Sequence, residues 1–256
     1  MCSSFLLYVQ RHLSLKSGAL WRPGYSLVLM LVLLVPGLQS CQGPVTRDAA
    51  LADFAPLAIA PDARRFRLRT DQSRLTVLVY RDGRLANLGH NHVVSSDDLQ
   101  GEIYIADTPQ DASFEIRIPV ETMDVDLPQY RVDAGDDFPG ELDPEAVNGT
   151  RANMLGAQQL DAEAWPEIVM RSRRVRGNLP DITVQVEIAV RSHVHTVEIP
   201  LQAIVSDERI VATGHFQLNQ TDLGLEPFSV MMGALKVRDQ LDIQFTLVAE
   251  ADNAGG

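Results

Sequence analysis

The stretch ITVQVEIAVR, residues 182–191, alternates between apolar and polar side chains. Successive side chains of a β-strand point to opposite faces, so the pattern predicts a strand with one buried face and one solvated face. Such strands are typical of antiparallel sheet, because strands of parallel sheet are usually buried on both faces. The buried face of this strand is expected to consist of Ile182, Val184, Val186, Ile188 and Val190.

The same two-residue period recurs along the chain. It is clear in FEIRIPV, residues 114–120, and in LDIQFTLV, residues 241–248. Further strands are expected at residues 75–81, 101–105, 167–175, 196–205 and 210–218. About eight strands, each with one wet face, predict an all-β fold that is either a closed antiparallel barrel or a sandwich.

One region breaks this pattern, and a helical insertion is predicted near residues 127–165. Residues 127–150 are acidic and punctuated by Pro and Gly, which is typical of loops. RANMLGAQQLDAEAW, residues 151–165, is expected to form a helix that Pro166 stops. A long crossing segment with a helix often covers or lines the mouth of a barrel.

Residues 1–40 have the composition of an export signal. The apolar run LVLMLVLLVPGLQSC, residues 27–41, is preceded by Arg11, Lys16 and Arg22 and contains no acid. The run is shorter than a membrane-spanning helix, which needs about 20 apolar residues.

The end of this run resembles a bacterial lipobox, with Leu38 three residues before Cys41. The resemblance implies cleavage before Cys41 and acylation of that residue as a lipid anchor; the alternative is an ordinary secretory signal with an incidental cysteine. Gln42 is not the Asp associated with inner-membrane retention, so the resemblance favours an outer-membrane lipoprotein on the periplasmic side of the envelope. Residues 41–65 are expected to be a flexible tether, and residues 252–256 a short tail.

The charge balance restricts the class of partner. Only three of the 22 Lys and Arg residues, and none of the 34 acids, precede residue 41, so the rest of the chain carries a formal charge of −15. Nucleic acids and anionic membrane surfaces attract basic patches, so neither is an expected partner, and a membrane attachment is expected to depend on the lipid.

Three segments, taken together, resemble the YceI-like family. They are IPVETMDVD, residues 118–126; NMLGAQQLDAEAWPEIVMRS, residues 153–172; and ATGHFQLNQTDLGLEPFSVMMGALKVRDQLDIQFTLVAE, residues 212–250. Their order and spacing follow the family pattern, and the resemblance covers residues 66–251. It implies a lipocalin-like antiparallel β-barrel around an apolar channel that holds an isoprenoid chain or a related amphiphile, in an exported bacterial protein without established catalytic residues.

The inward rows of the predicted strands are the candidates for lining this channel. A barrel of about eight strands can also be filled by its own side chains, so the rows by themselves fit a closed core equally well. The resemblance favours a channel. Its candidate lining residues are Val77, Val79, Phe114, Ile116, Ile118, Met170, Val184, Val186, Ile188, Phe216, Ile243 and Phe245.

Four histidines form two His-x-His pairs. His90 and His92 follow an apolar strand, near an open end of the implied barrel, where they are candidates for hydrogen bonding a ligand head group. Residues two apart on a strand share a face, so His90, His92, His193 and His195 are also candidates for a transition-metal site. His193 and His195 lie where the family pattern has a glycine-containing hairpin turn, which leaves that turn's geometry open.

No catalytic motif is visible, since the chain lacks a Gly-x-Ser-x-Gly elbow, a phosphate loop and an HExxH sequence. The chain is therefore expected to be a binding protein and not an enzyme, with a bound isoprenoid or fatty amphiphile and no metal cofactor. The alternative is a periplasmic metal- or redox-associated binding protein that uses the histidine pairs. The sequence leaves a homodimer open.

Overall fold

A computed structural model describes residue 54 and residues 56–252, so the predicted signal, Cys41 and most of the predicted tether lie outside the described residues. All the described residues belong to one compact unit. Within the described residues, no helix is both long and apolar enough to cross a bilayer.

The strands are β1 (Arg64–Leu68), β2 (Arg74–Asp82), β3 (His92–Ser96), β4 (Gln100–Ile105), β5 (Ser113–Pro119), β6 (Asp124–Val125), β7 (Glu167–Asn178), β8 (Asp181–Val190), β9 (His193–Val205), β10 (Arg209–Asn219), β11 (Ser229–Val230) and β12 (Leu235–Ala251).

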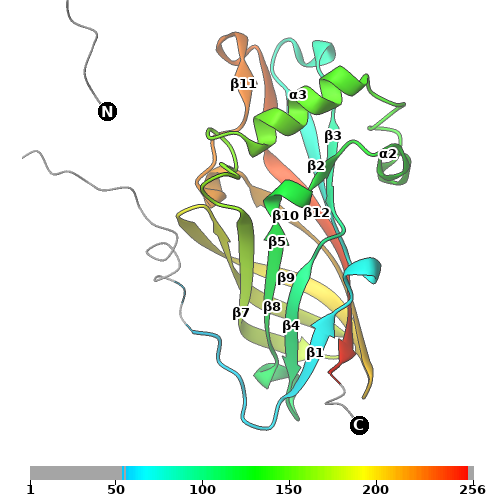
Figure 1. Ribbon diagram of the computed structural model, residues 1–256, viewed down its shortest axis with the longest axis vertical. Coiled ribbons are helices and arrows are strands. Elements are labelled where there is room, and N and C mark those ends of the chain that lie inside the picture. Colours follow the sequence, from blue (N-terminus) through cyan, green and yellow to red (C-terminus); the bar gives the residue numbers. More distant parts are fainter. Residues whose placement is uncertain (1–53, 55, 253–256) are drawn as a thin grey trace, which may run out of the picture. The chain divides into compact units, whose positions relative to one another are not determined.

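Eight of these strands close into an antiparallel barrel. Around the ring the order is β1, β4, β5, β7, β8, β9, β10 and β12, and β12 pairs back to β1 through Phe66 and Ala251. Every pairing in the ring is antiparallel. The prediction of an all-β, lipocalin-like barrel of about eight strands is therefore confirmed (Figure 1).

Strand β12 is 17 residues long, and on the same edge it pairs with two different strands. Its last residues pair with β1, whereas residues 236–246 pair with β2. Strand β2 pairs in turn with β3, and β3 pairs with β6. These three strands extend the wall beyond the ring at the end that carries the helices. The pattern analysis found β2 but missed β1, β3, β6 and β11.

Helix α3 (Pro144–Leu155) lies across the upper end of the barrel, and helix α2 (Pro128–Ala134) lies beside β3 (Figure 1). The prediction of a helix at residues 151–165 is wrong in its bounds. Asp143 caps the N-terminus by accepting a hydrogen bond of 2.8 Å from the Glu145 amide, and Pro144 occupies the first helical position. The helix ends before Gly156, and the residues up to Trp165 form turns instead.

The turn between β8 and β9 consists of Arg191 and Ser192. Arg191 takes a left-handed conformation with φ of 54°, which a glycine would adopt more readily. Its guanidinium donates a hydrogen bond of 3.1 Å to the Gln159 carbonyl in the loop after α3. The β8–β9 turn thus has Arg191, and its hydrogen bond to Gln159, at the position where a glycine was expected from the family pattern.

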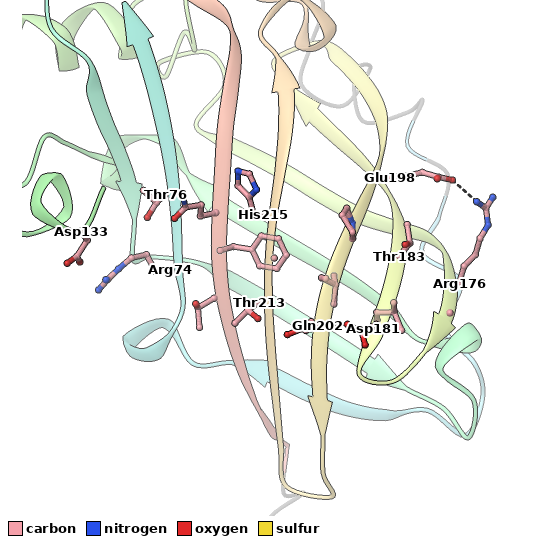
Figure 2. Close-up of a pocket in the computed structure, with 18 residues that line it drawn as sticks. Arg74, Thr76, Asp133, Arg176, Asp181, Thr183, Glu198, Gln202, Thr213 and His215 are labelled. Atoms are coloured by element: carbon pink, nitrogen blue, oxygen red, sulfur yellow. Dashed lines mark hydrogen bonds and ion pairs between the residues drawn. The ribbon is translucent and has the colours of Figure 1, made fainter. Parts of the chain in front are cut away.

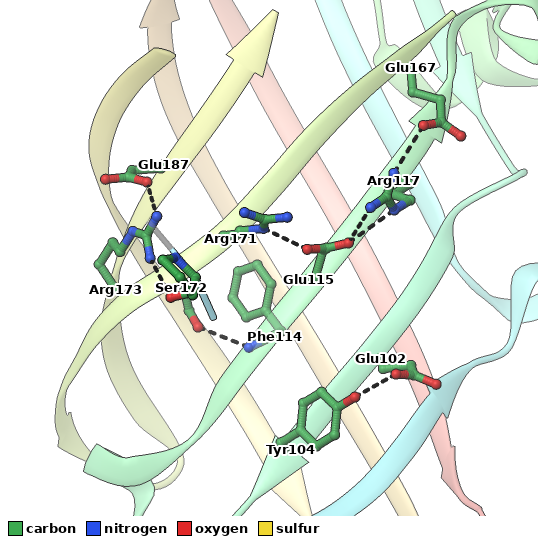
Figure 3. A network of polar contacts seen from close by, with 11 residues as sticks. Glu102, Tyr104, Phe114, Glu115, Arg117, Glu167, Arg171, Ser172, Arg173 and Glu187 are labelled. Carbon is green, nitrogen blue, oxygen red and sulfur yellow. Dashed lines mark hydrogen bonds and ion pairs between the residues drawn. The ribbon is translucent and has the colours of Figure 1, made fainter. Parts of the chain in front are cut away.

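The outer face of β5, β7 and β8 carries a network of ion pairs (Figure 3). Glu115 accepts hydrogen bonds from Arg117 at 2.7 Å and from Arg171 at 2.5 Å. Burial alone would raise the pKa of Glu115, but these two guanidinium groups hold it below its ordinary value. Phe54, within the predicted tether, is buried on this face with the Arg171 guanidinium 4.6 Å from its ring centre. The described part of the tether segment therefore contacts the barrel wall at this point.

Candidate ligand-binding site

The barrel interior contains a cavity of about 260 Å³ toward the end with the β9–β10 hairpin, here called the lower cavity. Side chains from β4, β5, β7, β8, β9 and β10 line it, as the inward alternation of those strands requires. The lining is apolar except for Asp107 and Ser113. Such a space suits a hydrocarbon chain, because a hydrocarbon forms no hydrogen bonds with the cavity wall.

A second cavity of about 160 Å³, here called the upper cavity, lies at the end covered by α3. Met154 of α3 contributes to its wall together with residues of β2, β7, β8, β10 and β12. Gln159 and Gln220 are its only polar lining residues. Within the described residues, the upper cavity is thus as apolar as the lower one.

Phe114 and Met170 lie between the two cavities. Phe114 lines the lower cavity and Met170 the upper one, and each packs against both hydrophobic core clusters. No described residue lines both cavities. One chain that occupies both spaces must therefore displace these side chains, and the flexible Met170 adapts more easily than an aromatic ring.

The upper cavity adjoins a third space of about 160 Å³, here called the mouth cavity. Five residues line both spaces, among them Val79, Met154 and Gln220. His92, Thr150 and Asn153 add polar groups to the mouth cavity, and no Lys, Arg, Asp or Glu residue lines it. An apolar chamber with a polar, uncharged rim is the usual arrangement of a site for an amphiphile.

His92 is held by a buried carboxylate. The His92 Nδ1 and Asp126 Oδ2 atoms lie 2.6 Å apart, and the Asp126 side chain is fully buried. Asp126 Oδ1 accepts hydrogen bonds from the Val93 amide at 2.9 Å and from Arg131 at 2.6 Å. Burial by itself would raise the pKa of Asp126, but hydrogen bonds from His92, Val93 and Arg131 outweigh it and lower the pKa. Asp126 therefore stays ionised and fixes the imidazole of His92 at the mouth.

Arg131 connects this carboxylate to the helical insertion. It extends from α2, its side chain is almost fully buried, and it donates further hydrogen bonds to the carbonyls of Asn91 at 2.8 Å and Gly140 at 3.0 Å. The segment that crosses the barrel end is thus joined to the strand that carries His92. Sequence reasoning missed the role of both residues. Asp126 ends the segment IPVETMDVD that resembles the family, and Arg131 follows in the predicted insertion, but nothing in the pattern shows that either contacts His92 or its carboxylate partner.

The predicted channel residues gather in the interior. Ten of the twelve line the lower or the upper cavity. Val186 is buried in the core without lining either cavity, and Phe245 packs edge-on against Phe216 at a centroid distance of 6.4 Å. The alternative of a core filled by its own side chains does not describe these two spaces, because both contain unfilled volume.

The histidine pairs are placed differently from one another. His92 lines the mouth cavity, whereas the neighbouring His90 is exposed, with its ring centre 6.4 Å from that of His92. His193 is exposed at the start of β9, and His195 follows on the same strand. Among the described residues, no three His, Cys, Asp or Glu side chains converge as metal ligands. The structure does not assemble the four histidines into one centre.

A wide groove of about 920 Å³ lies on the outer surface of β2, β12, β10, β9 and β8 (Figure 2). Thr76, Thr213, His215 and Gln202 are among the side chains on it, and Arg176 pairs with Glu198 at 2.8 Å at one edge. The groove begins where the β9–β10 pairing ends, at Gly214 and Leu201. Its lining mixes polar and apolar side chains, whereas the interior cavities are lined almost wholly by apolar ones, so the interior cavities are the better candidate site for an apolar chain.

The closed antiparallel barrel with internal apolar cavities defines this protein as a lipocalin-like binding barrel. The sequence profile of the YceI-like domain matches residues 66–249, and the chain therefore belongs to the YceI-like family, which is a family of binding proteins. The family and its apolar interior are consistent with binding of a small apolar ligand.

Two solved structures are similar to the chain at low sequence identity. Burkholderia cenocepacia BcnA is 13% identical with a TM-score of 0.51, and the match covers 71% of this chain and 98% of BcnA. A Campylobacter jejuni YceI protein is 7% identical with a TM-score of 0.44, and the match covers 61% of this chain and 82% of that protein. No curated protein matches the chain.

Proposed function

We propose that this protein is an exported, lipid-anchored carrier that holds an isoprenoid or another amphiphilic apolar chain in its barrel. The observation that carries the proposal is the upper cavity, apolar except for two glutamines, which opens onto a mouth cavity with polar groups. The apolar tail would occupy the interior and the head group the mouth.

The hydrogen bonds at the mouth favour one kind of head group. Thr150 donates its hydroxyl hydrogen to the Ala146 carbonyl at 3.0 Å, and the amide nitrogens of Gln159 and Gln220 donate to backbone carbonyls at 2.9 and 2.7 Å. In the neutral imidazole, the His92 Nδ1 hydrogen is directed at Asp126, which leaves Nε2 as an acceptor. These groups retain acceptor atoms for a ligand.

A head group that donates a hydrogen bond and carries no charge complements this set of acceptors. A hydroxyl group at the end of an apolar chain has this chemistry. A phosphate or carboxylate fits this set less well, because no Lys or Arg among the described residues lines the mouth cavity and a buried unpaired charge is costly. The proposed ligand class is therefore a long-chain alcohol or phenol.

Native mass spectrometry tests the carrier role. We would purify residues 42–256, which contain every described element, without added metal or detergent. An organic adduct whose solvent extract yields a prenyl or acyl chain supports the proposal. Val77→Phe, which fills the upper cavity, should reduce the adduct, whereas Val132→Phe on the exposed face of α2 should not. Equal adduct in a folded Val77→Phe variant would contradict binding in this cavity.

A matched ligand pair tests the head group. A polyprenol and its monophosphate of equal chain length would compete against a fluorescent apolar probe. The alcohol should bind about tenfold more tightly or better, since the phosphate buries charge without a partner. Equal or tighter binding of the phosphate would contradict the proposed head group and leave the apolar site intact.

The lipid anchor has its own test. Mass spectrometry of the N-terminal peptide from cells that express the full chain should show an acylated Cys41. The Cys41→Ser variant should lack the modification and leave the membrane fraction. An unmodified Cys41 in the wild-type peptide would contradict the anchor without affecting the binding site.

A further inference from the structure

The upper end of the barrel carries an exposed apolar tip, defined here as Leu88, Phe228, Val230, Met231 and Met232. These are five of the nine large apolar side chains that are exposed among the described residues. Met231 is 63% exposed, Leu88 is 64% exposed, and Met232 is fully exposed. Scattered single apolar residues are normal on a surface, but a cluster of this kind marks an interaction site.

Two separate loops form the tip. Leu88 belongs to the turn η2 (Ala86–Leu88), and Met231 and Met232 belong to η6 (Met231–Gly233). The loops are joined by a hydrogen bond of 2.8 Å from the Leu85 amide to the Ala234 carbonyl. Gly83 also approaches closely, since a Cβ at that position would lie 2.5 Å from the Ala234 oxygen. The apolar side chains are thus presented by paired loops and not by one free loop.

The backbone of η6 takes an uncommon conformation to present these methionines. Met231 has φ of 52° and Met232 has φ of 54°, both in the left-handed region that non-glycine residues rarely adopt. Such conformations are unfavourable for non-glycine residues and persist where the surrounding structure enforces them, often at functional sites. Here the conformation leaves two consecutive apolar side chains in solvent.

The charge around the tip is opposite to that of the whole chain. Residues 81–89 and 228–238 contain four basic residues and one acid, although the whole chain has a net charge of −12. The basic residues are Arg81, Arg84, Lys236 and Arg238, and the acid Asp82 lies 3.4 Å from Lys236. Salt limits the reach of charge to about 8 Å at physiological ionic strength, so the local excess decides what approaches the tip.

An acidic segment also lies beside the mouth. Residues 133–143 contain five acids, and Asn91 joins this segment to β2: it donates a hydrogen bond of 2.8 Å to the Asp137 carbonyl and accepts one of 2.9 Å from the Arg81 amide. The basic residues of the tip belong to β2, to the loop after it and to β12. A negatively charged surface would therefore meet the tip through these side chains.

The tip is continuous with the mouth cavity. Phe228 belongs to the tip and also lines the mouth cavity. Val237 on β12, which is not part of the tip, lines the mouth cavity beside it. An apolar chain could pass from a surface at the tip into the cavity without crossing bulk water. This continuity favours a lipid surface over a protein as the partner.

We infer that the apolar tip inserts into the surface of a lipid bilayer that contains anionic head groups, which places the mouth cavity against the membrane. Apolar side chains beside basic residues are typical of interfacial membrane binding. This docking goes beyond the proposed carrier role and does not require a bound ligand.

Vesicle sedimentation of residues 42–256 tests the inference without the N-terminal lipid. The protein should sediment with phosphatidylcholine–phosphatidylglycerol vesicles and less with phosphatidylcholine alone. Met231→Ser with Met232→Ser should reduce the partition about tenfold, since two methionines lose their burial. Arg84→Glu should reduce only the binding to anionic vesicles. The matched control is Ile204→Ser, which removes a 70% exposed apolar residue from β9 near the opposite end.

Absence of sedimentation for the wild type, or an equal loss in Ile204→Ser, would overturn the inference. A tip that serves a protein partner would give the first of these results. The organic adduct is measured in the same samples by native mass spectrometry. Loss of the adduct with intact vesicle binding refutes only the carrier role, and the reverse result refutes only the docking.

Discussion

The lower and upper ends of the barrel interior have similar walls but different closures. The lower cavity lies among strands and hairpins, and the Oγ of Ser113 in its wall is a buried polar atom that lacks a partner among the described residues. The upper cavity lies under α3 and adjoins a rim where His92 is fixed by Asp126. Inward rows of alternating strands build most of both walls, so the polarity of the upper end comes from β3, α3 and the loops beside them. The lower end has a mostly apolar wall, whereas the upper end combines an apolar wall with a polar rim.

The largest effect is expected from Asp126→Asn, which removes the charge that distinguishes the upper end. The variant leaves Arg131 buried without its carboxylate, and breaking a buried ion pair in this way costs about 3–5 kcal/mol. Asn tolerates the left-handed φ of 56° at this position, so backbone strain does not contribute. Urea denaturation measures the loss. The control is Asp124→Asn, an exposed acid two residues away, which should change the stability little.

Phe114→Ala should abolish the separation between the two ends. Removing the ring from between the cavities should cost about 3 kcal/mol in unfolding free energy. It should also let a longer apolar chain bind, because the cavities would join. Affinities for a chain-length series measure this second effect. A variant that is destabilised but keeps the wild-type length preference would show that Phe114 is not the barrier.

His92→Ala should weaken binding at the upper end more than His90→Ala does. One lost hydrogen bond of about 1 kcal/mol corresponds to roughly fivefold weaker binding of a polyprenol. The exposed His90 does not line the mouth cavity, so its variant should bind as the wild type does. Titration with the polyprenol compares the two variants. Equal affinity of both would remove His92 from the head-group contact.

The smallest effect at neutral pH is expected from titration of Asp126. Its pKa in the folded protein lies below the ordinary value of 3.8, so its ionised form stabilises the fold above the unfolded pKa. This contribution is lost as the pH falls through the folded pKa. Stability measured from pH 6 downward should therefore fall less steeply in Asp126→Asn than in the wild type, with about pH 4 as the start of the difference. Parallel curves would contradict the role of this carboxylate.

The alternating pattern predicted the barrel because a two-residue period reports burial directly. Each of the eight predicted strands is present, although β2 lies outside the closed ring. The pattern missed β1 because three of its five residues are arginines and only Phe66 and Leu68 face inward. It misplaced the helix because the apolar residues after Gly156 were read as helical, whereas the capping sequence Asp143-Pro144-Glu145 was the better signal.

The candidate site was less predictable because it depends on contacts between distant segments. His92 stood out as a member of a pair, but no pattern in the sequence distinguishes its burial from that of His90. The difference arises because Asp126 is 34 residues away and reaches His92 only after β6 pairs with β3. The glutamines of the mouth likewise look like ordinary polar residues of loops until the fold places them at the cavity.

The closure of the ring by β12 also bears on how the barrel folds. The pairs that close the ring join residues more than 180 positions apart, so β1 must wait for β12 before the wall is complete. Contacts this distant along the chain slow folding, because the entropy of a long loop is lost before they form. During synthesis, which starts at the N-terminus, the edges of β1 and β2 that pair with β12 would stay unpaired until β12 has been made. Until then, the apolar interior remains accessible from the side, and a ligand could be enclosed as the barrel closes.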